Sequence, residues 1–304
     1  MYTLLNSIVM RPGICLKGGG GISRGGRGRS VQVTRENLSR LANFLGYRED
    51  LIVGSQKTTE FTEMQIKQLN CNNFSEYMKR LKTSNKELQK LLEKIVVNVT
   101  GFFWIPRQYM LFRDLLGEIE KWRENERSLR IWSAGCATGE EPYSIAMILL
   151  GDKRFKDWDI KIIATDVVER FIEIAKKGRY ELSAYEGIRD DEFKKLFNKF
   201  TIREKDAFII SDEIKDLVAF ESHNLMEDFK IEELEDGAHI IFCRNVIIYL
   251  DEKNQIDVLR KLYKFLPSGG YLFLGLESIV GFRDEIISKF KVRKGRDSFC
   301  YQKP

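Results

Sequence analysis

A glycine loop between a buried strand and a helix constrains this chain more than any other stretch. Residues 131–144 read Ile-Trp-Ser-Ala-Gly-Cys-Ala-Thr-Gly-Glu-Glu-Pro-Tyr-Ser. Gly135 and Gly139 bracket a tight turn at which a ligand can approach the backbone closely. Such a strand–loop–helix unit is typical of α/β proteins that bind nucleotide-like cofactors.

The residues after the loop indicate which kind of cofactor fits. A helix N-terminus attracts anions, so phosphate-binding loops leave it free of acids. Here Glu140 and Glu141 occupy the first turn of the expected helix. Negative charge suits a cationic ligand without phosphate, and S-adenosylmethionine carries a sulfonium and an ammonium. On this stretch alone, the alternative that both glutamates only complement the helix dipole stays open.

The segment 133–146, Ser-Ala-Gly-Cys-Ala-Thr-Gly-Glu-Glu-Pro-Tyr-Ser-Ile-Ala, resembles the cofactor loop of the CheR-type chemotaxis-receptor methyltransferases. The resemblance continues in ordered blocks over residues 60–304. These enzymes transfer a methyl group from S-adenosylmethionine to glutamate side chains of receptors. The resemblance implies an α/β fold: a Rossmann-like class I methyltransferase sheet with helices on both faces, a small N-terminal helical domain and an inserted small antiparallel β-subdomain.

The sequence predicts three regions. Residues 1–34 are a Gly/Arg-rich tract, read as a disordered extension rather than a nucleic-acid or acidic-surface tail. Residues 35–97 predict the helical domain, with Leu38, Leu41 and Leu45 at helical spacing, Gly46 as a stop and Asn85 as a cap. Residues 98–304 predict the methyltransferase domain, with the β-subdomain at about 200–221 and a terminal hairpin around 295–297.

The amino-acid composition indicates which binding partners and which cellular compartment to expect. Five cysteines without a Cys-x-x-Cys pair and only two histidines argue against disulfides and a metal site, and favour a reducing cytoplasm. A net charge of +5 is no nucleic-acid signature, and no apolar run reaches the ~20 residues of a membrane-inserted helix. The resemblance implies that the partner is the cytoplasmic helices of methyl-accepting receptors. A basic face would meet them, with the alternative of a plain solvated surface: Lys79, Arg80, Lys82 and Lys86.

An acid ends the next buried strand. Residues 160–166, Ile-Lys-Ile-Ile-Ala-Thr-Asp, are mostly apolar and end in Asp166. Because ribose hydroxyls are bound by an acid at this place in such folds, Asp166 is the predicted ribose ligand, with the helix N-cap as the alternative. The resemblance implies further cofactor-binding residues, which with Asp166 form this set: Asn98, Thr100, Gly135, Glu141, Asn224, Leu225, Arg244 and Asn245.

The chain departs from the family pattern at one position. Residues 98–103 match the family motif Asn-x-Thr-x-Phe-Phe, after which an arginine follows, but here the next residue is Trp104. Arg107 lies one helical turn further on, and we expect it to replace part of the missing charge. The resemblance places Tyr249 near the reacting methyl group, so Tyr249 and Arg107 are the predicted catalytic residues.

The expected chemistry needs no general base. A glutamate side chain has a reference pKa near 4.3, so it is already an anion that can attack a sulfonium methyl. The enzyme then supplies alignment and excludes water. Two alternatives remain: an inactive cofactor-binding sensor, suggested by Trp104, and a methyltransferase with another substrate such as RNA. The Asn/Asp-Pro-Pro-Tyr signature of amino-group methyltransferases is absent at residues 244–247.

Overall fold

The computed structural model describes residues 31–275 and 286–304. The Gly/Arg-rich tract, apart from its last four residues, lies outside the described residues. Within the described ranges no helix has the length and apolar character needed to cross a membrane.

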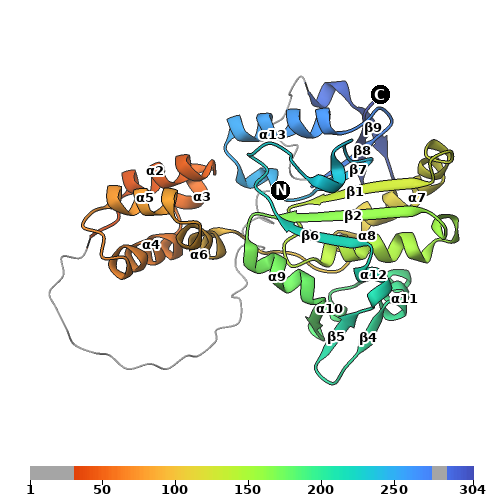
Figure 1. Ribbon diagram of the computed structural model, residues 1–304, viewed down its shortest axis with the longest axis horizontal. Helices are drawn as coiled ribbons and strands as arrows, with labels where there is room; N and C mark the ends of the chain where they lie inside the picture. Colours follow the sequence, from red (N-terminus) through yellow and green to blue (C-terminus); the bar gives the residue numbers. More distant parts are fainter. Residues whose placement is uncertain (1–30, 276–285) are drawn as a thin grey trace. The chain divides into compact units, whose positions relative to one another are not determined.

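One mixed sheet forms the centre of the methyltransferase region (Figure 1). Its strand order is β6-β2-β1-β7-β8-β10-β9. The first five strands run parallel, while β10 is antiparallel to both β8 and β9. This order confirms the expected Rossmann-like sheet with an antiparallel last strand. The strands are β1 (Ser128–Ala134), β2 (Asp159–Asp166), β6 (Val218–Ser222), β7 (Ile240–Cys243), β8 (Tyr271–Leu274), β9 (Lys291–Lys294) and β10 (Phe299–Gln302).

Both faces of the sheet are buried at its central strands β1, β2, β7 and β8, as their mostly apolar sequences require. Successive side chains point to opposite faces, so Ile131 enters one apolar core and Trp132 the other. The first core also holds the apolar faces of α7 (Pro106–Trp122) and α8 (Glu140–Gly151), and the second that of α13 (Glu252–Phe265). Helices therefore cover both faces, as expected.

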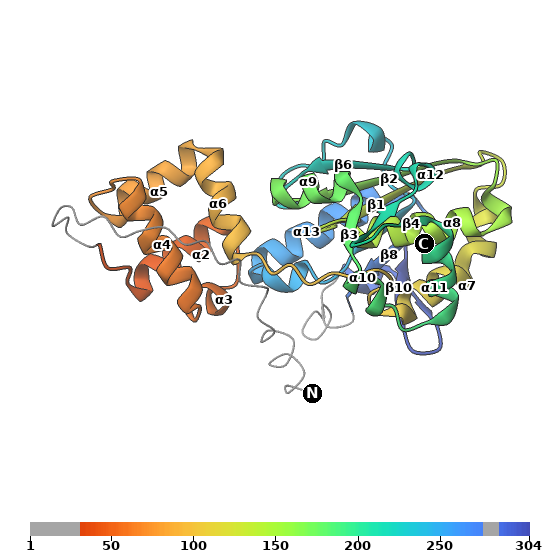
Figure 2. The ribbon, with the colours of Figure 1, turned by 90° about the horizontal axis from the view of Figure 1, so that it is seen from below.

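Residues 35–95 form a helical bundle, visible in both views (Figure 1, Figure 2). Gly46 ends the first helix in the left-handed conformation at φ 67°, as predicted. The prediction for Asn85 is wrong: Ser84 occupies the N-cap position, and Asn85 Nδ2 donates to Glu169 Oε1 at 2.7 Å. The helices are α2 (Arg35–Leu45), α3 (Glu49–Val53), α4 (Gln56–Gln68), α5 (Phe74–Thr83) and α6 (Asn85–Ile95).

A small antiparallel sheet is inserted after α9 (Glu169–Lys177), with the order β3-β5-β4. Its strands are β3 (Arg179–Glu181), β4 (Thr201–Arg203) and β5 (Ala207–Ile210). The predicted limits of 200–221 need correction at both ends. The sheet begins at Arg179, and the apolar stretch at 218–220 belongs to β6, which pairs in parallel with β2. Val218 and Phe220 alternate into the core, a pattern that fits either sheet.

Candidate active site

The carboxyl ends of β1, β2, β6 and β7 meet at one edge of the sheet, where ligands bind in open α/β folds. β1 is followed by Gly135 and β7 by Arg244, while β2 ends in Asp166. The register pairs Ala134 with Thr165 and Asp166 with Ser222, two residues before Asn224. The predicted cofactor-binding residues of these strands therefore lie at the same edge.

The glycine loop has the tight geometry that its sequence predicts. Gly135 lies at φ 89°, and a Cβ there would come within 2.2 Å of Val246 Cγ2. The amides of Gly135 and Cys136 both donate to Thr165 O at 2.8 Å. Gly139 follows at φ 98°, and α8 begins at the next residue. Only glycine fits at 135 without strain, and the loop is fixed to β2 by its backbone.

Asp166 is buried and holds the loop in place. Its Oδ2 accepts from Ala137 N at 2.9 Å and its Oδ1 from Val168 N at 3.0 Å. Burial raises the pKa of Asp166, and the backbone amides oppose that rise. The alternative that Asp166 is the N-cap of the following helix is wrong, because Val168 occupies that position before α9.

Arg244 is the centre of a buried polar network. Its Nη1 donates to Glu141 Oε2 at 3.0 Å, and the two side chains are 3% and 12% exposed. Its Nε donates to Gln108 Oε1 at 2.6 Å, its Nη2 donates to the carbonyl of Trp104, and its guanidinium lies 4.9 Å from the Tyr109 ring centroid. Burial raises the pKa of Glu141, while Arg244 lowers it. Arg244 thus joins β7, α7 and the first turn of α8.

Sequence reasoning did not identify Gln108. This residue is fully buried on α7, and its Nε2 donates to Leu274 O at 2.6 Å while its Oε1 accepts from Arg244. It therefore fixes the Arg244 guanidinium to the end of β8. One signal was available: Gln108 is a polar residue within the apolar face of α7, where an amide needs partners.

The two glutamates of α8 face different partners. Glu140, 9% exposed, accepts from Thr138 Oγ1 at 2.7 Å. Burial raises the pKa of Glu140, and hydrogen bonds from the Thr138 and Thr100 hydroxyls oppose the rise. Glu141 instead accepts from Ser133 Oγ at 2.8 Å besides Arg244. Both residues lie in the first turn near the helix dipole, but each also makes specific contacts.

The segment before α7 reaches the site with an unusual backbone. Phe103 and Ile105 have φ angles of 52° and 59°, and Trp104 lies between them with 43% of its surface exposed. The Phe103 amide donates to Ser144 Oγ at 2.9 Å, which attaches this segment to α8. Asn98 is exposed and Thr100 half-buried.

The two predicted catalytic residues lie on different elements. Tyr249 is half-buried at the end of a 3-10 turn, Ile247–Tyr249, that follows Asn245 at φ 57°. Arg107 is exposed in the first turn of α7, and within the described residues no hydrogen bond or ion pair joins its side chain to the Arg244 network. Its carbonyl accepts from Ser298 Oγ at 2.9 Å.

On the remaining side of the site, Asn224 and Leu225 follow β6. Asn224 Oδ1 accepts from Met226 N at 3.0 Å, and Leu225 is buried in the second core.

Within the described residues there is no group of three or more metal-ligating side chains. Burial raises the pKa of Cys136 well above its usual value, so its thiol stays protonated and unreactive.

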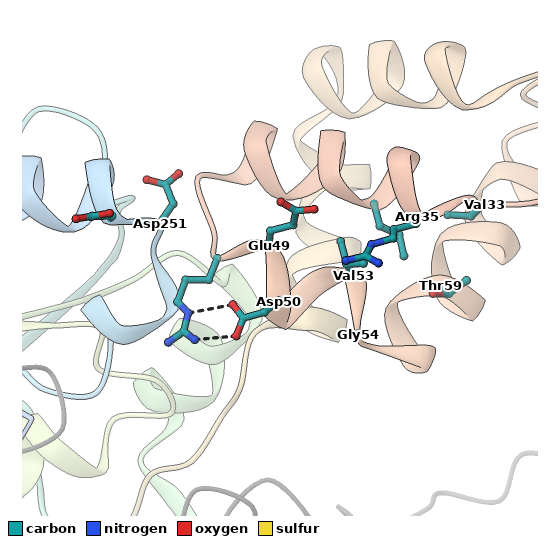
Figure 3. Close-up of a pocket in the computed structure, with 11 residues that line it drawn as sticks. Val33, Arg35, Glu49, Asp50, Val53, Gly54, Thr59 and Asp251 are labelled. Atoms are coloured by element: carbon teal, nitrogen blue, oxygen red, sulfur yellow. Dashed lines mark hydrogen bonds and ion pairs between the residues drawn. The ribbon is translucent and has the colours of Figure 1, made fainter. Parts of the chain in front are cut away.

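A separate cavity of about 1000 Å³ lies between the helical bundle and the start of α13 (Figure 3). Its lining carries charges of both signs, including Arg35, Glu49 and Asp251. Arg48 binds Asp50 with two hydrogen bonds of 3.1 and 2.7 Å, drawn as dashed lines. Its described lining contains none of the predicted site residues, although Arg48 N donates to the carbonyl of Tyr249 at 3.0 Å.

A family model described as the CheR methyltransferase, SAM binding domain, matches residues 98–295. This chain belongs to the CheR family. It is 33% identical over 258 residues to the chemotaxis protein methyltransferase of Borreliella burgdorferi, covering 81% of this chain and 89% of that protein. It is 32% identical over 214 residues to the probable chemotaxis protein methyltransferase of Rhizobium etli, covering 69% and 79%.

The cofactor of this CheR-family protein is S-adenosylmethionine. The residues present fit it: the loop that begins at Gly135, where a Cβ would meet Val246, is bonded to the Asp166 carboxylate, and Glu141 adds a second carboxylate at the same edge. Glu141 is paired with Arg244, whereas no cation is bonded to Asp166 among the described residues, so the Asp166 charge suits a ligand that carries a sulfonium and an ammonium.

Proposed function

We propose that this protein transfers the methyl group of S-adenosylmethionine to glutamate side chains of chemotaxis receptors and forms methyl esters. The observation that carries the proposal is the carboxyl edge itself. There the Gly135 loop, buried Asp166 and the Arg244–Glu141 pair lie at the ends of neighbouring parallel strands, which supports a single cofactor site at this edge. Relatives over most of the chain are named chemotaxis protein methyltransferases.

In this proposal each part of the edge has one task. Asp166 accepts hydrogen bonds from the ribose hydroxyls, and Asn224 and Leu225 border the adenine. Glu141, oriented by Arg244 and Ser133, faces the amino-acid end together with Gly135. The remaining pocket walls are formed by Asn98, Thr100 and Asn245.

S-adenosylmethionine, when bound, supplies an electrophilic methyl group. The protein's part is to place a receptor glutamate, already an anion at neutral pH, in line with that group and to exclude water. Tyr249 orients this carboxylate. Arg107, exposed at the start of α7, attracts it. Because no proton has to be removed from the attacking oxygen, this site needs no general base.

The receptor surface that we propose is the basic face of α5 and α6. Lys79, Arg80, Lys82 and Lys86 are all exposed, and none of the four forms an ion pair with another described residue. Such unpaired cations can attract the acidic cytoplasmic helices of a methyl-accepting receptor and raise the association rate. The reaction would then take place in the cytoplasm.

One assay separates this function from its alternatives. The protein is incubated with methyl-labelled cofactor and, in parallel, receptor cytoplasmic fragments or RNA. We expect label on the receptor that mild alkali releases as methanol, since esters hydrolyse there and N-methyl groups do not. Label on RNA, or alkali-stable label on protein, would refute the ester. Cofactor binding without any transfer would favour the sensor alternative, which Trp104 motivates.

A further inference from the structure

The turn between α2 and α3 contacts the loop that carries Tyr249. Tyr47 pairs with Leu250 as an isolated antiparallel bridge. On either side of this pair, Arg48 N donates to Tyr249 O at 3.0 Å and Asp251 N donates to Gly46 O at 3.0 Å. The backbone of the helical bundle is therefore hydrogen-bonded directly to the edge where the cofactor binds.

The approach is close enough to require glycine at position 46. A Cβ there would lie 2.4 Å from Met226 Sδ and 2.6 Å from Asn254 Nδ2, and the φ of 67° already disfavours other residues. Asn254 Nδ2 also donates to Gly46 O at 3.3 Å. The turn is thus seated against the segment that follows Asn224 and Leu225.

The Tyr47 side chain lies between the bundle and the sheet. It packs against the bundle's apolar core and also against the second core of the sheet, which includes Leu225, Ile247 and Leu250. Burial raises the pKa of Tyr47, and the nearby charge of Asp166 raises it further. The phenol therefore stays neutral and keeps its hydroxyl proton for donation.

We propose that Tyr47 is a cofactor-contacting residue that the helical bundle supplies to the methyltransferase site. The inference rests on the proposed assignment of Asp166 to the ribose. Adenosine offers a flat ring and two hydroxyls, and a tyrosine that pairs with Leu250, next to Tyr249, offers a ring face and one hydroxyl in return. The bundle then forms a wall of the pocket at its adenosine end.

Calorimetric titration of the full chain tests this with two ligands, S-adenosylhomocysteine and methylthioadenosine, which lacks the amino-acid end. We expect Tyr47→Ala to weaken both by roughly tenfold, and Tyr47→Phe to weaken both by a few-fold, because the contact is to adenosine. The control Tyr263→Ala removes another half-buried tyrosine, which packs on Phe290 at the far end of α13, and should leave both affinities unchanged.

The outcomes distinguish a failure of the ribose assignment of Asp166 from a failure of the proposed Tyr47 contact. If the wild-type chain binds no S-adenosylhomocysteine, or Asp166→Ala binds it as well as wild type, the ribose assignment fails and the inference with it. If those two behave as expected but both Tyr47 variants bind like wild type, only the inference is overturned. Tyr47→Phe keeps the ring packing, so its affinity decides the matter even if Tyr47→Ala unfolds.

Discussion

Replacing Arg244 with methionine should destabilise the protein strongly, because the guanidinium is the only cation bonded to buried Glu141 among the described residues. Methionine keeps the length and apolar volume of the side chain but removes every donor. Glu141 and Gln108 then each lose a hydrogen-bond partner, as does the carbonyl of Trp104. With side chains only 3% and 12% exposed, water cannot readily replace the lost donors.

The magnitude follows from the cost of leaving one buried charge without its partner, which is ~3–5 kcal/mol. For a domain of ~150–250 residues each kcal/mol lowers the midpoint by ~2–4 °C, so we expect a drop of about 10 °C. The double variant Arg244→Met/Glu141→Gln should recover part of this loss, since the orphaned charge is gone. Arg113→Met breaks an exposed pair with Glu192 at 2.6 Å and serves as the control, with a loss under ~1 kcal/mol.

The stability difference between Arg244→Met and wild type should change with pH in a defined direction. Burial raises the pKa of Glu141, and in Arg244→Met the cation that lowers it is missing. A carboxyl whose pKa is raised by folding contributes stability below its unfolded value, near 4.5, and loses it as the pH rises through the folded value. The deficit of the variant relative to wild type should therefore be largest at neutral pH and shrink on acidification.

Thermal unfolding followed by circular dichroism between pH 5 and 8 measures both the loss of stability and its change with pH. A variant within ~1 kcal/mol of wild type at pH 7 would show that the pair is not what holds this network together. A deficit that grew on acidification, or one that stayed unchanged in the Glu141→Gln background, would refute the role given to the Glu141 charge.

The remaining predictions concern ligands and rate. Asp166→Ala should weaken S-adenosylhomocysteine by roughly tenfold to a hundredfold in calorimetry, and unchanged affinity would contradict the ribose assignment. Because burial raises the pKa of Asp166, wild-type affinity should fall as the pH drops toward that raised value, since a protonated acid loses acceptor capacity. Truncating the receptor's last residues should leave methylation nearly unchanged: the resemblance implies that members which bind a receptor's C-terminal pentapeptide carry glycines in this hairpin, and residues 201–210 contain none. A large loss of rate would refute this. Arg107→Ala should lower the methylation rate more than cofactor affinity, whereas Trp104→Arg should be tolerated or raise the rate. If wild type methylates no receptor and Trp104→Arg restores turnover, the sensor alternative is correct.

The parts of the site that lie close together in sequence were predictable, and those that depend on distant pairing were not. The glycine loop and the strand ending at Asp166 are local patterns, because their chemistry follows from residue type and strand position. Gln108 and Arg244 are 136 residues apart, and no local rule says that these two side chains meet. The contact between Tyr47 and the loop that carries Tyr249 was missed for the same reason, since it depends on how the bundle pairs with Leu250.

The fold shows the same division. The large sheet could be predicted because buried parallel strands are rich in apolar residues, as at 162–164 of β2. The small sheet could not be delimited, because β3 is three residues long with only Tyr180 buried. The strand at 218–222 looked like part of it until the pairing with β2 decided otherwise.

The left-handed backbone on either side of Trp104 has a consequence for how this enzyme can diversify. A non-glycine residue in that region costs about 1–3 kcal/mol, so the kink at Phe103 and Ile105 persists only because the surroundings impose it. The restraints act on backbone atoms: Arg244 holds the carbonyl of Trp104, and Ser144 holds the amide of Phe103. Neither contact depends on which side chain occupies position 104. The backbone conformation at position 104 is therefore fixed independently of its side chain. One substitution can replace an aromatic ring with a charged group there without changing the backbone.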